Sequence, residues 1–338
     1  MTPPPGLPAG PVPASAARLG LRGRLVVGAA GLASRLPEGL LVAAAESAGE
    51  LWYRTAPAKR DQARMNLRRV CEDLAATGRG PARARRAASD PKALERLVRA
   101  AFRHAARYYL EVLRAGSYTL EGALAQVQIE DEAAVRTALR DGSPVIVVGM
   151  HYGAIELPVT ILSGVTGHAV MAPMETVDNP ALAAWFAASR RRVGVNVIPI
   201  RDARRALVGA IRRGESVGLV SDRDLTGSGL PVPLFGHPAP IAAGPAFLSL
   251  ETGAPIYAAS TRRTGVGRYS ARLAPVPAPP DGPRRERLVA YTRSIAVAFE
   301  AIVADAPEQW WGAFHPIWPD LVAGDVGDAG ATTPEAAP

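Results

Sequence analysis

The second half of the chain alternates short apolar runs with longer amphipathic segments. The runs are rich in β-branched residues and end at glycine or charged residues, which predicts strands, and the segments between them have helical spacing. This alternation is typical of an α/β fold, in which a central, mostly parallel sheet is flanked by helices on both faces. The predicted strands are 144–149, 169–172, 195–199, 216–221 and 254–260, with an antiparallel strand at 268–276.

Helices are predicted between these strands. One begins after His151 and ends near Ser163, and Asn179 is placed to cap another. The residues 222–243 contain no helical period and are expected to form a long loop. The other predicted helices cover 180–192, 203–213, 244–251 and 287–304.

The first half of the chain reads as helical. Residues 91–114 carry a broad apolar stripe at helical spacing, and shorter helices are expected at 56–70 and 131–140. A basic segment with glycine and proline, 78–86, is expected to be a linker. We therefore expect a single domain of residues 16–320, mainly helical over 16–140 and α/β over 141–320, between a disordered leader (1–15) and a disordered tail (321–338).

Residues 19–53 are the most membrane-like part of the sequence. Charged residues interrupt them, so no apolar run approaches the ~20 residues that span a bilayer. Two helices packed on the core would explain the pattern. A membrane-surface region would also explain it, with Arg22, Arg24 and Arg35 at the level of the lipid phosphates.

The net charge of +8, nearly all of it from arginine, favours phosphate-bearing partners such as nucleic acid, an anionic membrane or a phosphorylated cofactor. The bias of a GC-rich genome would also raise the arginine content. The single cysteine, Cys71, excludes an internal disulfide and a cysteine metal cluster.

His151 is the first candidate for chemistry. It follows a predicted buried strand and a glycine, and a carboxylate, Glu156, comes five residues later. A histidine in the turn before a helix can act as a general base when a carboxylate binds one of its ring nitrogens. A histidine engaged in capping the helix would produce the same spacing.

Further polar residues follow other predicted strands. Asp222, Arg223 and Asp224 follow the strand 216–221, and Glu175 follows the strand 169–172. Because ligands bind at the carboxyl edge of parallel sheets, these groups are candidates for substrate binding. A simple ion-pair turn, or an Asp-x-Asp metal site of a glycosyltransferase, would also suit Asp222 and Asp224.

Arg190 belongs to a group of three arginines, 190–192, that ends a predicted helix. Cations are favourable at that end of a helix, so a solvated helix end would explain the group. A phosphate clamp is the functional alternative.

Several short blocks occur in a fixed order along the chain. They are His151-x4-Glu156, 172–175, 186–194, 222–224, 229–236, 244–246, 252–255 and 307–311 with Trp318. In the order and spacing of these blocks, the chain resembles the lipid A lauroyl/myristoyl acyltransferase and phosphatidylinositol mannoside acyltransferase family of lysophospholipid-type acyltransferases. The family commonly has Asn-aromatic where this chain has Ala154-Ile155, and Phe-Phe-Gly where it has 234–236.

The resemblance implies transfer of an acyl chain from a CoA or carrier-protein thioester to a hydroxyl of a membrane glycolipid. It implies His151 as the base, Glu156 as its partner, and Glu175, Arg190 and Asp222 in the same groove, with no metal and no cofactor apart from the donor. Family members that act on lipid A usually carry a membrane-spanning N-terminus, and no apolar run of that length is found in 19–53. The sequence therefore favours the mannoside branch of the family. We expect a peripheral protein on the cytoplasmic face of the cell membrane. It would bind an anionic membrane surface and not nucleic acid.

Two other hypotheses remain open at this point. One is a metal-dependent glycosyltransferase that uses Asp222 and Asp224. The other is a lipid-binding protein without catalytic activity.

Overall fold

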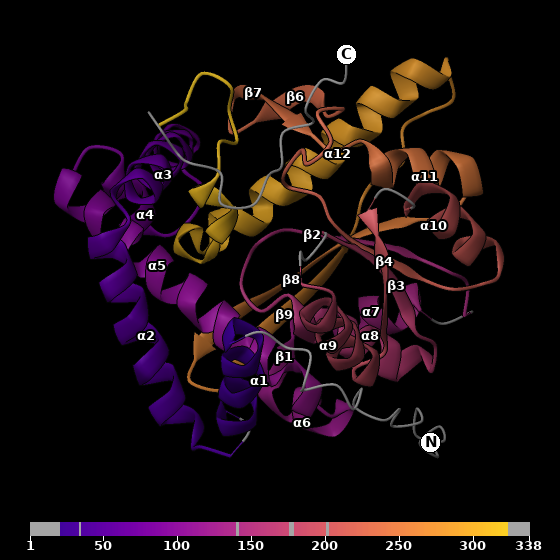
Figure 1. Ribbon diagram of the computed structural model, residues 1–338. Helices are drawn as coiled ribbons and strands as arrows, with labels where there is room; N and C mark the ends of the chain where they lie inside the picture. The colour runs from indigo at the N-terminus through magenta and orange to yellow at the C-terminus, as the bar shows by residue number, and fades with distance from the viewer. Residues whose placement is uncertain (1–20, 34, 140–141, 176–178, 201–202, 324–338) are drawn as a thin grey trace, which may run out of the picture.

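A seven-stranded sheet organises the described part of the chain (Figure 1). The computed structural model describes residues 21–33, 35–139, 142–175, 179–200 and 203–323. The strand order is β1-β9-β8-β2-β5-β3-β4, and a separate hairpin contains β6 and β7. The strands are β1 (Val127–Ile129), β2 (Ile146–Gly149), β3 (Val170–Met174), β4 (Val195–Pro199), β5 (Val217–Val220), β6 (Leu230–Leu234), β7 (His237–Ile241), β8 (Ile256–Gly265) and β9 (Arg268–Pro275).

The sheet is parallel from β8 through β4, and β9 runs antiparallel to β8. The short strand β1 extends the sheet beyond β9. The prediction of a mostly parallel sheet with an antiparallel strand near 268–276 is therefore confirmed.

Helices cover both faces of the sheet, as the α/β pattern predicted (Figure 1). One face carries α10 (Ala203–Arg212), α11 (Gly244–Thr252) and α12 (Arg284–Asp305). The other face carries α6 (Leu120–Gln126), α7 (Glu132–Ala138), α8 (Glu156–Thr166) and α9 (Pro180–Arg192). The predicted cap of α9 is present, because Asn179 accepts a hydrogen bond from the amide of Leu182 at 2.9 Å.

The N-terminal helices form a group beside the sheet (Figure 1). They are α1 (Leu21–Ala33), α2 (Glu38–Thr55), α3 (Pro57–Thr77), α4 (Ala82–Ala87) and α5 (Pro91–Arg114). Helices α1 and α2 both pack on α5, so the expected helix pair is present. No helix in the described ranges is long and apolar enough to cross a bilayer.

The C-terminal segment links this helical group to the sheet. It contains two short 3-10 helices, η4 (Pro307–Gln309) and η5 (Trp311–Phe314), and another, η2 (Ala115–Ser117), follows α5. Helix α5 contacts both η4 and η5. The core includes the fully buried aromatic side chains of Phe102, Phe299, Trp310 and Trp318.

Two predictions of irregular structure are wrong. The expected linker 78–86 contains most of α4, whose Ala84 and Ala87 are buried. The expected loop 222–243 contains the β6–β7 hairpin, in which alternate prolines obscure the strand pattern. The proposed leader, 1–15, and residues 324–338 of the proposed tail lie outside the described residues.

Candidate functional site

His151 lies just beyond the carboxyl end of β2, in a tight turn that leads into α8. Gly153 in this turn has a φ of 55°, and a Cβ there would lie 2.0 Å from the carbonyl oxygen of Thr261 on β8. Only glycine fits such a close approach of two backbones. The glycine therefore allows the turn to pack against β8 and places the imidazole at the edge of the sheet.

Asp222 is the hydrogen-bonding partner of His151. Imidazole Nδ1 lies 2.6 Å from Asp222 Oδ1. Strands β2 and β5 are parallel neighbours in which Gly149 pairs with Val220, and each catalytic candidate follows its strand by the same two residues. Strand register thus brings the two side chains together across 71 positions of sequence.

The Asp222 carboxylate is buried and held on both sides. Its other oxygen, Oδ2, accepts a hydrogen bond from Nε1 of Trp310 at 2.8 Å. Burial by itself would raise the pKa of Asp222, but His151 and the Trp310 hydrogen bond outweigh it, and the pKa lies below its usual value. The carboxylate is therefore kept ionised, which holds Nδ1 protonated and leaves Nε2 as the basic nitrogen.

The backbone around His151 is clamped by the C-terminal segment. The His151 carbonyl accepts from the amides of Trp311 and Gly312, at 2.9 and 3.2 Å, and the Gly153 amide donates to the carbonyl of Gln309 at 3.0 Å. The Gln309 side chain bonds both the amide and the carbonyl of Arg263, each at 2.8 Å. One short segment thus joins the histidine turn to β8.

A buried ion pair supports the turn from behind. Arg263 makes two hydrogen bonds to the Glu111 carboxylate, at 2.7 and 2.6 Å, and donates to the Gly153 carbonyl at 2.9 Å. Burial would lower the pKa of Arg263, but Glu111 outweighs this, and the pKa is raised. The guanidinium stays charged and ties α5 to the histidine turn.

Glu156 does not form the pair with His151 that the sequence predicted. It is the first residue of α8, and its buried carboxylate lies 3.0 Å from the guanidinium of Arg190 on α9. Burial would lower the pKa of Arg190, but the attraction of Glu156 raises it overall. The structure therefore joins two predicted site residues to each other and leaves Asp222 as the partner of His151.

The remaining predicted residues occupy the same edge of the sheet. Arg223 and Glu175 form a loose ion pair at 3.8 Å, in which the Glu175 side chain is 53% exposed. Asp224 caps the following loop, with hydrogen bonds from the amides of Thr226 and Gly229 at 3.2 and 2.7 Å. Its carboxylate thus has a structural task within its own turn.

The arrangement suits proton transfer by a side chain. Within the described residues, no group of three His, Cys, Asp or Glu side chains gathers as a metal site would need. The His151 side chain is 13% exposed, which leaves the imidazole within reach of a substrate. This geometry suits a general base, because Asp222 engages Nδ1 and leaves Nε2 for a substrate.

Aromatic rings connect the histidine to the N-terminal helices. The Trp311 ring lies edge-on to His151 at 4.5 Å and stacks on Tyr108 at 4.2 Å. Tyr108 neighbours Tyr109 at 5.4 Å, and Tyr109 lies 6.2 Å from Trp52 on α2. Burial, followed by the nearby Glu156, raises the pKa of Tyr108, so its hydroxyl stays neutral. Trp311, Tyr108, Tyr109 and Trp52 thus form an aromatic row that runs from His151 to α2.

A histidine paired with a buried carboxylate at the carboxyl edge of a parallel sheet is an arrangement typical of enzymes that take a proton from a substrate group. Residues 21–319 match the family of bacterial lipid A biosynthesis acyltransferases, and the chain belongs to this family. The protein is therefore an acyltransferase, as the sequence predicted. Membership in this family overturns the glycosyltransferase and non-catalytic hypotheses.

Two curated relatives share one name, phosphatidylinositol mannoside acyltransferase. The chain is 27% identical to the phosphatidylinositol mannoside acyltransferase of Mycolicibacterium smegmatis over 240 residues, which are 69% of this chain and 74% of the relative. It is 29% identical to the enzyme of that name from Mycobacterium tuberculosis over 138 residues, 40% of this chain and 41% of the relative.

Sequence reasoning missed several residues that shape the site. Trp310, Gln309, Arg263 and Glu111 come from segments far from His151 in sequence. In the sequence, the 307–311 block stands out only through the family resemblance. A buried arginine and glutamate of opposite charge, 152 residues apart, leave no local pattern that would pair them.

Proposed function

We propose that the protein transfers an acyl chain from a thioester, acyl-CoA or acyl carrier protein, to a hydroxyl of a membrane glycolipid of the phosphatidylinositol mannoside type. The observation that carries the proposal is the 2.6 Å contact between His151 Nδ1 and Asp222 Oδ1. The names of the two relatives support the choice of acceptor. Lipid A-type transfer is the second candidate, because it is in the description of the matching family.

His151 acts as the general base. Nε2 takes the proton from the acceptor hydroxyl as its oxygen attacks the thioester carbonyl carbon, and Asp222 stabilises the imidazolium that forms. The tetrahedral intermediate then breaks its carbon–sulfur bond. The imidazolium returns the proton to the thiolate that leaves, so the free thiol and the new ester are the products.

Glu156 and Arg190 form a largely buried ion pair that accompanies the His151–Asp222 dyad in the proposed site. Their contact at 3.0 Å joins the start of α8 to the end of α9. Asp222 thus takes the role first predicted for Glu156. Glu175 and Arg223 are substrate-binding groups, because their ion pair is loose and partly exposed, which leaves both able to bind sugar hydroxyls or phosphate.

The aromatic row gives the acceptor a path to His151. Tyrosine and tryptophan have an apolar body and a polar end, which suits the boundary between lipid and water. Tyr109, which is 53% exposed, lies next to Trp52 at one end of the row, and Trp311 contacts His151 at the other. A glycolipid with its acyl chains near the N-terminal helices would present its sugar hydroxyls along this row.

Helices α1 and α2 form the membrane-facing surface. Leu25, Leu32, Leu40 and Leu51 each expose between 58% and 65% of their surface, although large apolar side chains are usually buried. Leu25 and Leu32 lie on the same side of α1, and Leu40 and Leu51 on the same side of α2. With the net charge of +8, these leucines favour peripheral attachment to an anionic cytoplasmic leaflet.

The test is the lipid composition of a strain that lacks the gene. Mass spectrometry should find a glycolipid one acyl chain short, and the wild-type gene should restore the missing chain. A gene with His151→Ala should fail to restore it. An unchanged set of glycolipids, or full restoration by His151→Ala, would contradict the proposal, and the nature of the short species separates mannoside from lipid A acceptors.

A further inference from the structure

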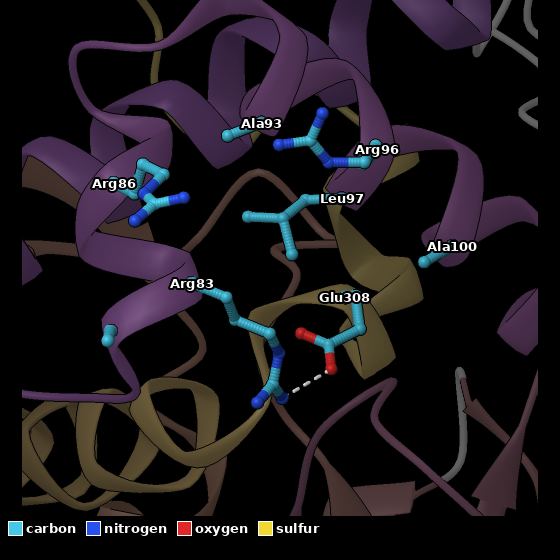
Figure 2. A pocket seen from close by; sticks show the side chains of 8 residues that line it. Arg83, Arg86, Ala93, Arg96, Leu97, Ala100 and Glu308 are labelled. Carbon is cyan, nitrogen blue, oxygen red and sulfur yellow. Dashed lines mark hydrogen bonds and ion pairs between the residues drawn. The ribbon is translucent and has the colours of Figure 1, made fainter.

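A cavity of about 480 Å³ opens between α4, α5 and η4 (Figure 2). Its volume lies within the range of small-molecule sites, roughly 300–1,000 Å³. Ala93, Leu97 and Ala100 of α5 supply an apolar wall. The side chains that give the cavity its chemistry are three arginines and one carboxylate.

Two of the arginines can receive an anion. Arg86 of α4 and Arg96 of α5 extend toward the same space (Figure 2). The Arg86 side chain makes no hydrogen bond or ion pair in the described part of the chain, and the ion pair of Arg96 with Asp90 is exposed and 3.8 Å long. Exposed pairs of this kind contribute about 0–1 kcal/mol, so Arg96 is easily redirected.

Glu308 provides a buried acceptor without a donor. The residue is only 8% exposed, and Oε1 accepts from Arg83 at 2.7 Å. Oε2 is fully buried and has no hydrogen-bond partner. Figure 2 shows this carboxylate directed into the cavity, opposite Leu97. A buried acceptor without a donor is unfavourable, so the site calls for a ligand that supplies one.

We propose that this cavity binds a phosphate ester with a neighbouring hydroxyl. The phosphate accepts hydrogen bonds from Arg86 and Arg96, because the planar guanidinium matches phosphate oxygens. The hydroxyl donates to Glu308 Oε2, while Arg83 neutralises the charge of that carboxylate. The carbon skeleton lies against Leu97.

The cavity is separate from the acyl-transfer site. Ala100, its last lining residue on α5, precedes Tyr108 of the aromatic row by eight residues, about 12 Å along the helix axis. Its ligand could be the headgroup of a phospholipid or the phosphorylated ribose of a nucleotide, since both carry phosphate beside hydroxyl. Binding can be measured without acyl transfer, so failure of the proposed function would leave this inference intact.

The first test is calorimetric titration of the full-length protein with sn-glycerol 3-phosphate. Arg86→Ala and Arg96→Ala should each weaken binding at least about tenfold, which is the loss expected for a charge-assisted hydrogen bond. Arg285→Ala is the matched control, because Arg285 is an exposed arginine on α12 and its loss changes the net charge equally. Equal weakening by all three variants, or no binding to the wild type, would overturn the proposal.

The second test isolates the hydroxyl. Glu308→Gln keeps the side-chain volume and removes the carboxylate. It should weaken binding of glycerol 3-phosphate, but it should not weaken binding of sulfate, which has no proton to donate. Loss of affinity for both ligands, or for neither, would remove Glu308 from the site.

The two sources of the ligand are separated by their own titrations. Vesicles that contain phosphatidylglycerol test the headgroup, and coenzyme A tests the nucleotide. Binding of either one that falls in both arginine variants but not in Arg285→Ala supports the site and names its source. If neither responds specifically to Arg86→Ala and Arg96→Ala, both proposed sources of the ligand are wrong.

Discussion

Trp310 donates its indole N–H to Asp222 Oδ2 at 2.8 Å, on the opposite carboxylate oxygen from the one that faces His151. The tryptophan comes from the C-terminal segment, which also accepts and donates the backbone hydrogen bonds of the histidine turn. Orientation of the dyad therefore depends on the packing of this segment as well as on the two strands.

Trp310→Phe should lower kcat by about tenfold and leave KM unchanged. The change removes one donor from a buried carboxylate, which costs about 1–3 kcal/mol and raises the pKa of Asp222. Steady-state kinetics and the acid side of the pH–rate profile would measure the effect. Trp318→Phe is the control, because Trp318 is equally buried but donates to the Leu234 carbonyl. If both variants lost only stability, Trp310 would have no part in positioning the dyad.

Asp222→Asn and Glu156→Gln should have different effects. The amide that Asp222→Asn introduces cannot hold the imidazole in the required tautomer, and the corresponding change in a serine protease costs roughly 10⁴ in kcat. Glu156→Gln leaves the partly buried Arg190 without its counter-charge, which should cost at most about 3 kcal/mol of stability with a rate loss below about tenfold.

Initial acyl-transfer rates and urea unfolding would measure the two effects. Asp224→Asn is the control for Asp222, since its carboxylate serves the 224–229 loop. A folded Glu156→Gln protein as inactive as Asp222→Asn would return the partner role to Glu156.

The sequence predicted the location of the catalytic candidates better than their pairing. A β-branched run that ends at Gly149 and is followed by His151 is a local pattern, and so is the run that ends before Asp222. The contact between them depends on β2 and β5 being neighbours, with β3 and β4 placed beyond β5. Strand order results from how whole βαβ units pack, and no residue near His151 encodes it.

The fold elements that escaped prediction have local causes. Strand β1 is only three residues long, and β6 and β7 carry prolines at alternate positions. Proline is normally a mark against a strand, but an isolated hairpin tolerates it at positions that make no ladder hydrogen bond. Helix α4 consists only of alanine and arginine, so its buried alanines leave no apolar stripe to detect.

The free energy of unfolding should decrease as the pH is lowered from 7 to 5, because of His104. Burial, and then the charges of Arg263 and other arginines, lowers the pKa of His104 to about 3. The unfolded chain therefore binds the proton near pH 6.5, whereas the folded chain binds it only near pH 3. Stability is lost as the pH falls from the first of these values toward the second. The loss from this residue is about 2 kcal/mol at pH 5.

Urea unfolding at both pH values would measure this loss. His104→Gln should reduce the pH dependence by about that amount, whereas His168→Gln, at an exposed position, should leave it unchanged. Equal pH dependence in the wild type and His104→Gln would show that His104 is not held neutral.

Attachment to membranes should require both charge and the exposed leucines. High salt should release the protein from anionic vesicles, because charges are screened beyond about 10 Å at roughly 0.1 M. Leu40→Ser should weaken binding about tenfold or more, the loss expected when one leucine no longer enters the lipid. Co-sedimentation with vesicles measures both effects.

Val297→Ser is the matched control for Leu40→Ser. Val297 is also apolar and is 56% exposed, but it lies on α12, away from α1 and α2 (Figure 1). Equal losses for the two variants would remove the leucines from the membrane surface, and attachment that resists salt would assign it to apolar insertion alone.

The most direct test of the account is the rate of labelled acyl transfer from acyl-CoA to phosphatidylinositol mannoside in vesicles, for the wild type and His151→Ala. We expect the wild type to form the acylated glycolipid. His151→Ala should lose at least about 10²-fold in rate, the lower bound for a general base, while it binds vesicles as well as the wild type does. Transfer at the wild-type rate by His151→Ala would contradict the assignment of His151 as the base.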